Sequence, residues 1–292
     1  MLPQEIIKKV KRIQLKMLHL SNDTMSGHYI SAFKGTGIEF DEVREYVPGD
    51  DIRSIDWNVT ARSRTPYIKR YVEERELTVI LIVDLSASQR FGTVNALKSE
   101  LAAEISALLA FLAIKNNDKV GLLIFSDTRE RYVPPQKGRR HVLRVIREIL
   151  AYEPTGTGTN INEALTFINK VIKHRSIVFL ISDFMAVDFE RSLKSLARRH
   201  DLVAVSLSDP KEKELPAIGL VEFRDAETGA RTLLDTSLPQ VRAAFKQKAL
   251  DRAKATEKLF KRNKVDLIDI SADQPYLQPL QKFFLKRERR IR

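Results

Sequence analysis

The chain has 292 residues, which allows about two domains and a self-supporting hydrophobic core. Apolar residues make up 43% and charged residues 30%, a composition typical of folded globular proteins and unlike that of disordered or collagen-like chains. The absence of cysteine excludes disulfides, thiolate zinc sites and a cysteine nucleophile. No apolar run approaches the ~18 residues that a membrane-spanning helix needs, and no signal-peptide pattern is present, so we expect a cytoplasmic location.

The positive charge is concentrated in two stretches. Lysine and arginine outnumber aspartate and glutamate by 50 to 38, which leaves a net charge of +12. Residues 1–20 and 239–292 hold this excess, and the rest of the chain is close to neutral. Basic segments of this kind can bind an anionic membrane surface or an acidic protein. No base-stacking aromatic pattern accompanies them, so a nucleic-acid partner is not expected.

The first residues predict an amphipathic helix over 4–20, with lysines and an arginine between its apolar positions. The apolar residues recur at spacings of four and three: Ile6, Val10, Ile13, Met17 and Leu20. We expect this helix to dock on its own domain, with an anionic membrane as the alternative. Three glycines, at 27, 35 and 37, predict an irregular stretch that leads into a polar segment over 40–70.

From Leu77 onward, β-rich apolar runs alternate with segments of helical periodicity, a pattern typical of a parallel sheet covered by helices. Six strands are predicted: Thr78–Asp84, Lys119–Phe125, Arg129–Val133, Ser176–Ile181, Leu202–Leu207 and Val265–Ile270. Helices are predicted near residues 94–115, 137–151, 160–173, 188–199, 239–262 and 275–290.

Two short connections predict hairpins. Only residues 126–128 separate the second and third strands, too few for a crossover helix, so this pair should be antiparallel. Residues 219–223 and 230–234 flank a turn-forming segment and predict a second hairpin. The predicted fold is therefore α/β: a doubly wound, Rossmann-like, mostly parallel six-stranded sheet with one antiparallel edge strand. We expect residues 1–76 to form a small N-terminal region and residues 77–292 the main domain, with a hairpin insertion around 211–236.

Three segments should bring oxygen-bearing side chains to the carboxyl edge of this sheet, where ligands of open α/β sheets bind. The first strand ends in Asp84, Ser86 and Ser88, and the fourth ends in Ser182-Asp183. Between them, a glycine-bearing loop with Thr159 opens a helix. Two carboxylates with neutral hydroxyls suit Mg²⁺, and leave it able to accept a further carboxylate from a partner. The alternative is a network of caps and turns at the strand ends.

The order Asp84-X-Ser86-X-Ser88, then Thr159, then Asp183, resembles the metal-ion-dependent adhesion site of von Willebrand factor A domains. The resemblance implies a von Willebrand factor A fold. It also implies that the serines and the threonine contact Mg²⁺, or Mn²⁺ or Ca²⁺, directly, while the aspartates act directly or through water. An aspartate or glutamate from a partner would then complete the coordination.

A second resemblance lies upstream, in Phe40-Asp41-Glu42-Val43-Arg44-Glu45-Tyr46-Val47-Pro48-Gly49-Asp50-Asp51-Ile52-Arg53-Ser54-Ile55-Asp56-Trp57. It is similar to the signature of the bacterial family called domain of unknown function 58. Members are typically encoded beside MoxR-type AAA+ ATPases and are thought to serve them as von Willebrand-type adaptors in maturing or remodelling other proteins. The resemblance therefore implies a MoxR-like ATPase, or its client, as the partner.

The charged residues of this signature have two interpretations. They form either an ion-pair network that locks the segment onto the domain or a partner-binding surface: Arg44, Asp50, Asp51, Arg53 and Asp56. The ion-pair network would also include Arg62. Trp57, the single tryptophan, is interpreted as a core anchor, with partner contact as the alternative.

The sequence thus predicts a divalent-cation-dependent protein-binding adaptor without catalytic residues. One alternative is a metal-dependent hydrolase, such as a phosphoesterase, that uses the same aspartates. Another is a peripheral membrane scaffold anchored by its basic ends.

Overall fold

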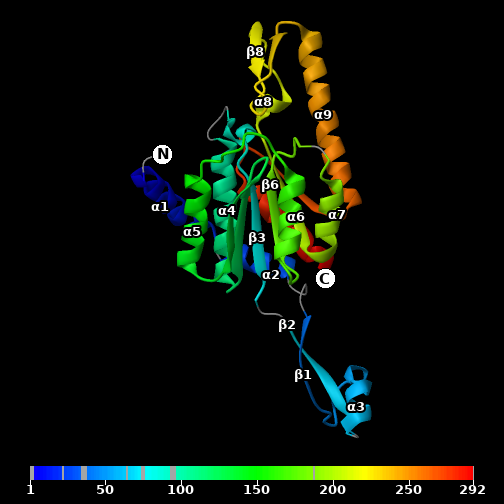
Figure 1. Ribbon diagram of the computed structural model, residues 1–292. Coiled ribbons are helices and arrows are strands. Elements are labelled where there is room, and N and C mark those ends of the chain that lie inside the picture. Colours follow the sequence, from blue (N-terminus) through cyan, green and yellow to red (C-terminus); the bar gives the residue numbers. More distant parts are fainter. Residues whose placement is uncertain are drawn as a thin grey trace.

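The computed structural model describes residues 3–21, 23–33, 38–63, 65–73, 76–92, 97–186 and 188–291. Its centre is a six-stranded sheet with the strand order β10-β7-β6-β3-β4-β5 (Figure 1). The strands are β3 (Thr78–Asp84), β4 (Lys119–Phe125), β5 (Arg129–Gln136), β6 (Ile177–Ser182), β7 (Asp201–Ser208) and β10 (Asp266–Ser271). All pair in parallel except β5, which runs antiparallel to β4 at one edge. The predicted fold class and the antiparallel edge strand are confirmed.

Helices cover both faces of this sheet, so its central strands are buried on both sides. Along β3, Val79, Leu81 and Val83 face one hydrophobic core, whereas Ile80 and Ile82 face the other. Continuous apolar strands of this kind are what a doubly covered parallel sheet requires. The first core is closed by α1 (Pro3–Leu20), α2 (Asp23–Phe33), α4 (Lys98–Lys115), α5 (Arg139–Ala151) and α10 (Leu277–Ile291). The second is closed by α6 (Ile161–Val171), α7 (Glu190–Arg199) and the end of α9 (Pro239–Arg262).

Helix α1 docks on the main body, as the sequence predicts. Its apolar stripe buries Ile13 and Met17 in the first core, against α4 and α5. Two of its lysines pair with acidic residues of α4: Lys9 with Glu100 and Lys16 with Glu104. Part of the basic face of α1 is therefore used within the chain.

Helix α2 was not predicted. The expectation of an irregular stretch around Gly27 is wrong, because Gly27 lies within this helix. A side-chain carbon added at Gly27 would meet nothing within 4 Å, so close packing does not require glycine there. Glycine costs a helix about 1 kcal/mol relative to alanine. Burial of Tyr29 and Phe33 against Phe284 of α10 offsets that cost, with ring centroids 6.0 and 6.1 Å from Phe284. Residues 34–37, which hold the other two glycines, lie outside the described residues.

The signature segment forms a separate small lobe (Figure 1). This lobe lies at the opposite end of the molecule from the N-terminal end of helix α9. Strands β1 (Ile38–Glu45) and β2 (Tyr67–Glu73) pair antiparallel, and η1 (Ile52–Ser54) and α3 (Trp57–Ser63) connect them. Arg44 binds Asp50 through two hydrogen bonds of 2.9 and 2.7 Å. Asp56 accepts from two backbone amides at the start of α3 and lies 3.6 Å from Lys69 Nζ. These interactions lie within the lobe, so they stabilise the lobe itself.

Trp57 is not a core residue. It begins α3 with 67% of its surface exposed, and Ile52 and Val47 of the same lobe are 65% and 56% exposed. The expectation of a core anchor is wrong because the lobe is a two-stranded ribbon with little interior of its own. Its buried side includes Ile68, which bridges to Ile55.

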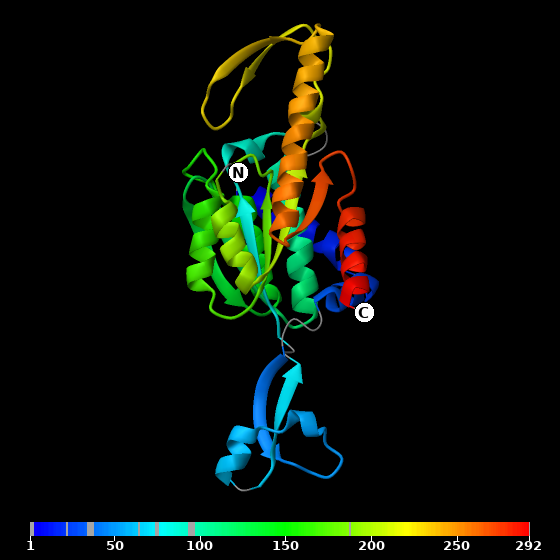
Figure 2. The ribbon, with the colours of Figure 1, turned by 90° about the vertical axis from the view of Figure 1, so that its right-hand side faces the viewer.

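A second projection rises from the other end of the sheet. The short helix α8 (Pro210–Lys213) leads into the predicted hairpin, β8 (Leu220–Arg224) and β9 (Arg231–Asp235), which is followed by the long helix α9. Figure 2 shows the hairpin arching from the top of α9 back toward the loops of the main body. Two 3-10 turns complete the described elements, η1 and η2 (Ala87–Arg90). Among the described residues, no helix is long and apolar enough to cross a membrane.

We expect Phe33→Ala to lower the free energy of unfolding by about 3–5 kcal/mol. The Phe33 ring is fully buried and contacts the rings of Tyr29 in α2, Phe179 in β6 and Phe284 in α10. Trp57→Ala is the matched control and should change the free energy of unfolding by no more than about 0.5 kcal/mol, since the Trp57 ring is largely exposed. Urea denaturation followed by circular dichroism measures both. Equal losses for the two variants would contradict this assignment of core and surface.

Candidate functional site

The candidate residues meet at the carboxyl edge of the sheet, where β3 and β6 lie side by side. Val83 of β3 is paired with Ile181 of β6, so Asp84 and Ser182-Asp183 leave the sheet together. The chain departs from β3 toward β4 on one side, whereas β6, β7 and β10 extend the sheet on the other. This is a topological switch point, the place where open α/β sheets form their binding crevice.

Asp84 is a fully buried carboxylic acid at the end of β3. Its Oδ2 accepts a hydrogen bond of 2.6 Å from the Ser182 hydroxyl, and its Oδ1 accepts one of 2.9 Å from the Ser86 amide. Within the part of the chain that the structure describes, no basic side chain pairs with Asp84. Burial, together with the negative charge of Asp183, raises the pKa of the Asp84 carboxyl to about 7, although both hydrogen bonds oppose this.

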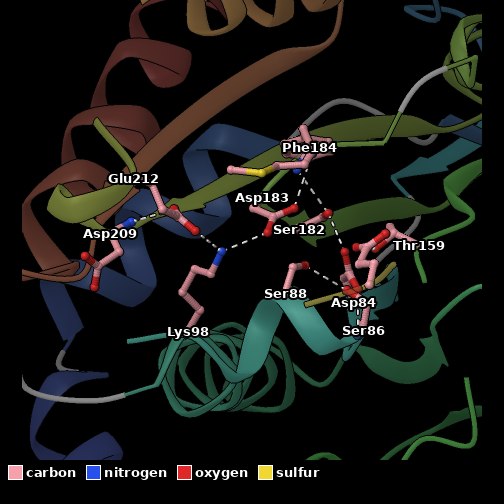
Figure 3. A network of polar contacts seen from close by, with 12 residues as sticks. Asp84, Ser86, Ser88, Lys98, Thr159, Ser182, Asp183, Phe184, Asp209 and Glu212 are labelled. Atoms are coloured by element: carbon pink, nitrogen blue, oxygen red, sulfur yellow. Dashed lines mark hydrogen bonds and ion pairs between the residues drawn. The ribbon is translucent and has the colours of Figure 1, made fainter. Parts of the chain in front are cut away.

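The two serines follow Asp84 in a tight turn. Ser86 is fully buried and is the N-cap residue of η2, and its Oγ lies 3.0 Å from Ser88 Oγ. The spacing of two residues places both hydroxyls near Asp84, as Figure 3 shows.

The glycine-bearing loop is held over this turn by a residue that the sequence did not single out. Glu130, on β5, accepts hydrogen bonds from the amides of Thr155 and Gly156 and from the Thr155 hydroxyl. Burial disfavours the ionised form, but these bonds and that from Ser126 keep the pKa of Glu130 below its usual value. The loop passes so close to Asp127 that a Cβ at Gly156 would lie 1.6 Å from its Oδ1. A side chain at Gly156 would have to displace the exposed Asp127 carboxylate and the Ser126 hydroxyl. The loop also contacts the turn directly, because Thr157 O accepts a hydrogen bond of 3.0 Å from the Ala87 amide.

A buried lysine enters the site from helix α4. Lys98 is fully buried, and its Nζ lies 2.8 Å from Asp183 Oδ2 and 2.6 Å from Glu212 Oε1 (Figure 3). Burial alone would lower the pKa of Lys98, but the charges of Asp183 and Glu212 outweigh it and leave the pKa raised. Glu212 is itself fixed, because its other oxygen accepts from the Asp209 amide in the capping box of α8.

The structure thus brings together the five residues of the predicted metal site: Asp84, Ser86, Ser88, Thr159 and Asp183. The signature residues lie elsewhere, in the lobe at the opposite end of the sheet (Figure 1). Within the described ranges, no group of three or more acidic or histidine side chains is arranged to hold a metal ion. A cation at this edge would therefore depend on hydroxyl oxygens as well as on two carboxylates.

One protein family matches most of the length of the chain. The family model described as "Protein of unknown function DUF58" matches residues 42–255, from the lobe to the middle of α9. The chain belongs to the DUF58 family.

DUF58 relatives span almost the whole chain. Uncharacterized proteins of Mycobacterium bovis and Mycobacterium tuberculosis are each 29% identical over 283 residues, which is 96% of this chain and 89% of theirs. A shorter uncharacterized protein of Mycobacterium avium is 27% identical over 160 residues, covering 54% of this chain and 94% of its own.

Solved structures with a similar chain path are more distant in sequence. An aerotolerance-related membrane protein from Bacteroides fragilis is 16% identical, with a TM-score of 0.48, covering 72% of this chain and 99% of its own. The conserved hypothetical protein BatB from Bacteroides thetaiotaomicron is 15% identical, with a TM-score of 0.47 and coverages of 73% and 99%. The von Willebrand factor A domain of SpRpn10 is 13% identical, with a TM-score of 0.38 and coverages of 70% and 93%.

The raised pKa of Asp84 predicts a pH-dependent stability in the absence of divalent cations. The native state binds this proton more tightly than the unfolded chain does, so the stabilisation is lost as the pH rises from about 4 through about 7. We expect Asp84→Asn, measured in EDTA, to be more stable than the wild type at pH 8 and to lose that advantage at pH 4.5. Urea unfolding at the two pH values measures the difference, and an advantage independent of pH would contradict the prediction.

Lys98→Met should destabilise the protein by about 3–5 kcal/mol, because Asp183 and Glu212 would keep their charges without a buried cation. Lys115→Met, on the same helix, is the matched control. Lys115 is partly exposed and contacts the fully exposed Asp23 and, at 2.8 Å, the Ser21 carbonyl oxygen, so its loss should cost about 1 kcal/mol. Denaturant titration of the two variants compares them, and similar costs would show that the Lys98 pairs contribute little.

Proposed function

We propose that this DUF58 protein is a divalent-cation-dependent protein-binding adaptor. Asp84, Ser86, Ser88, Thr159 and Asp183 would hold Mg²⁺, or Mn²⁺ or Ca²⁺, and an aspartate or glutamate of a partner protein would complete the coordination. A MoxR-like AAA+ ATPase, or its client, is the partner that the family resemblance suggests. The uncompensated charge of the buried Asp84 carboxylate is the observation that carries this proposal.

The charge balance of the site supports a cation. Asp84, Asp183 and Glu212 carry three negative charges when ionised, and Lys98 supplies one positive charge to the latter two. Buried charges are normally paired or bound to metal ions. A divalent cation beside Asp84 would neutralise the remaining charge and lower the pKa of its carboxyl.

The donor atoms also fit such a cation. All are oxygens, which hard cations prefer, and hydroxyls can bind through a lone pair while donating their hydrogen elsewhere. Of the two Asp183 carboxylate oxygens, Oδ2 binds Lys98. Among the described residues, the contact given for Oδ1 is a hydrogen bond of 3.2 Å from the Met185 amide. We therefore propose that Asp183 acts through Oδ1 or through water.

A metal-dependent hydrolase would place a further demand on the site. A hydrolase at this edge would need a general base beside the metal. Among the described hydrogen bonds of the five site residues, none involves a histidine. The hydrolase and the membrane scaffold stay as sequence-based alternatives.

A thermal-shift titration with Mg²⁺ and Mn²⁺ tests the proposal. A ligand that binds only the native state adds about 2.7 kcal/mol of stability at a hundredfold excess over its Kd. We expect this shift in the wild type and its loss in Ser86→Ala. Ser106→Ala should keep the shift, because it removes a buried serine hydroxyl of α4 that has no hydrogen-bond partner among the described residues.

Partner capture supplies a second readout of the same proposal. Wild-type protein and Ser106→Ala should capture a MoxR-like ATPase in Mg²⁺ and release it in EDTA, whereas Ser86→Ala should not capture it. Equal shifts in the wild type and Ser86→Ala, or no shift in either, would overturn the proposed cation site.

A further inference from the structure

A carboxylate from outside the sheet reaches the candidate site. The Thr159 hydroxyl donates a hydrogen bond of 2.6 Å to Glu227 Oε1, which lies 68 residues further along the chain. The adjacent Gly158 is also near this side chain, since a Cβ added there would lie 3.9 Å from Glu227 Oε2. Glu227 belongs to the turn of the β8–β9 hairpin, whose tip arches toward the main body (Figure 2).

The hairpin turn is built to present Glu227. Asp225 Oδ1 accepts from the amides of Glu227 and Thr228 at 2.9 and 2.8 Å. These bonds, with that of the Thr228 hydroxyl, lower the pKa of Asp225 and keep it ionised. Gly229 closes the turn with a φ of +71°, in the left-handed region that favours glycine. The direction of Glu227 is therefore set by the turn.

The rest of the hairpin is loosely attached to the main body. Leu220 and Leu233 on its two strands are 66% and 61% exposed. Its base is fixed by Thr236, whose hydroxyl donates to Gly219 O at 2.7 Å, and its side by the ring contact between Phe223 and Phe245 of α9. An exposed two-stranded element can move at low cost in free energy. The tip can therefore leave Thr159 without disturbing either hydrophobic core.

We propose that the β8–β9 hairpin is a cap on the candidate cation site and that Glu227 supplies, from within the chain, the carboxylate that a partner would supply. A partner's acidic side chain must then displace the hairpin tip before it can bind. The contact between the hairpin tip and Thr159 is argued from geometry alone. The role of Glu227 as a cation ligand rests on the proposed function. The Thr159 hydroxyl can serve both, because it donates its hydrogen to Glu227 and keeps lone pairs for a cation.

Two substitutions of Glu227 separate its hydrogen bond with Thr159 from its negative charge. Glu227→Ala removes both, whereas Glu227→Gln keeps an oxygen that accepts from Thr159 and removes the negative charge. Glu222→Ala and Glu222→Gln are the matched controls, since Glu222 lies on the same hairpin and pairs with Arg231.

Hydrogen exchange of metal-free protein tests the contact. We expect the amides of residues 155–161 to exchange several-fold faster in Glu227→Ala than in the wild type, and to be unchanged in Glu227→Gln and in both controls. Wild-type exchange rates in Glu227→Ala would overturn the cap.

Titration with Mn²⁺ alone tests the ligand role. Glu227→Gln should bind Mn²⁺ about tenfold more weakly and show higher water-proton relaxivity, because water replaces the carboxylate. If Ser86→Ala loses Mn²⁺ binding but Glu227→Gln matches the wild type, the ligand role is overturned and the proposed function stands. If the wild type binds no Mn²⁺, the proposed function and the ligand role both fail, and hydrogen exchange alone decides the contact.

Discussion

The buried carboxylate of Asp84 at the junction of β3 and β6 is the constraint around which the carboxyl edge of this protein is arranged. Both faces of the sheet are covered by helices, so a charge at the end of its central strand is shielded from water. Hydrogen bonds from Ser182 and Ser86 hold the carboxylate in place without neutralising it. The neighbouring Asp183 has its own cation in Lys98, which leaves Asp84 as the group that a bound cation would serve.

Several loops converge at the carboxyl edge of the sheet, around Asp84. Glu130 fixes the loop that carries Thr159, and the capping box of α8 fixes the Glu212 that shares Lys98. The Glu130 bonds and the Lys98 pairs join segments that are distant in sequence, so the site is assembled only when the sheet is complete. Fixing ligand groups by their neighbours in this way keeps the cost of organising them low at the moment of binding.

The DUF58 signature and the candidate site lie at opposite ends of one strand. The lobe with its exposed Trp57 precedes β3, and Asp84 closes β3 at the other edge (Figure 1). The two surfaces can therefore contact different molecules, or different parts of one large assembly. The adaptor that we propose, acting between an ATPase and its client, would use two such separate surfaces.

Local patterns predicted much of this architecture. Thr78–Asp84 and Lys119–Phe125 have the predicted bounds, because uninterrupted apolar runs identify strands that are buried on both faces. Helix α2 was missed because its glycine and polar residues hide a helix that is stabilised by packing on α10. Trp57 was misplaced because hydrophobicity alone does not tell whether an interior exists nearby to bury the ring.

Short-range patterns were enough to predict the alternation of strands and helices and the antiparallel edge strand. The geometry of parallel strands was enough to predict that one edge of the sheet gathers the five candidate residues, Asp84, Ser86, Ser88, Thr159 and Asp183. Long-range packing, in contrast, places Lys98 against Asp183, Glu130 against the glycine-bearing loop and Glu227 against Thr159. Lysine and glutamate are usually surface residues, and no local pattern marks the ones that folding brings into a buried site. Their partners lie far away in the chain, so only the packed sheet and its insertions reveal them.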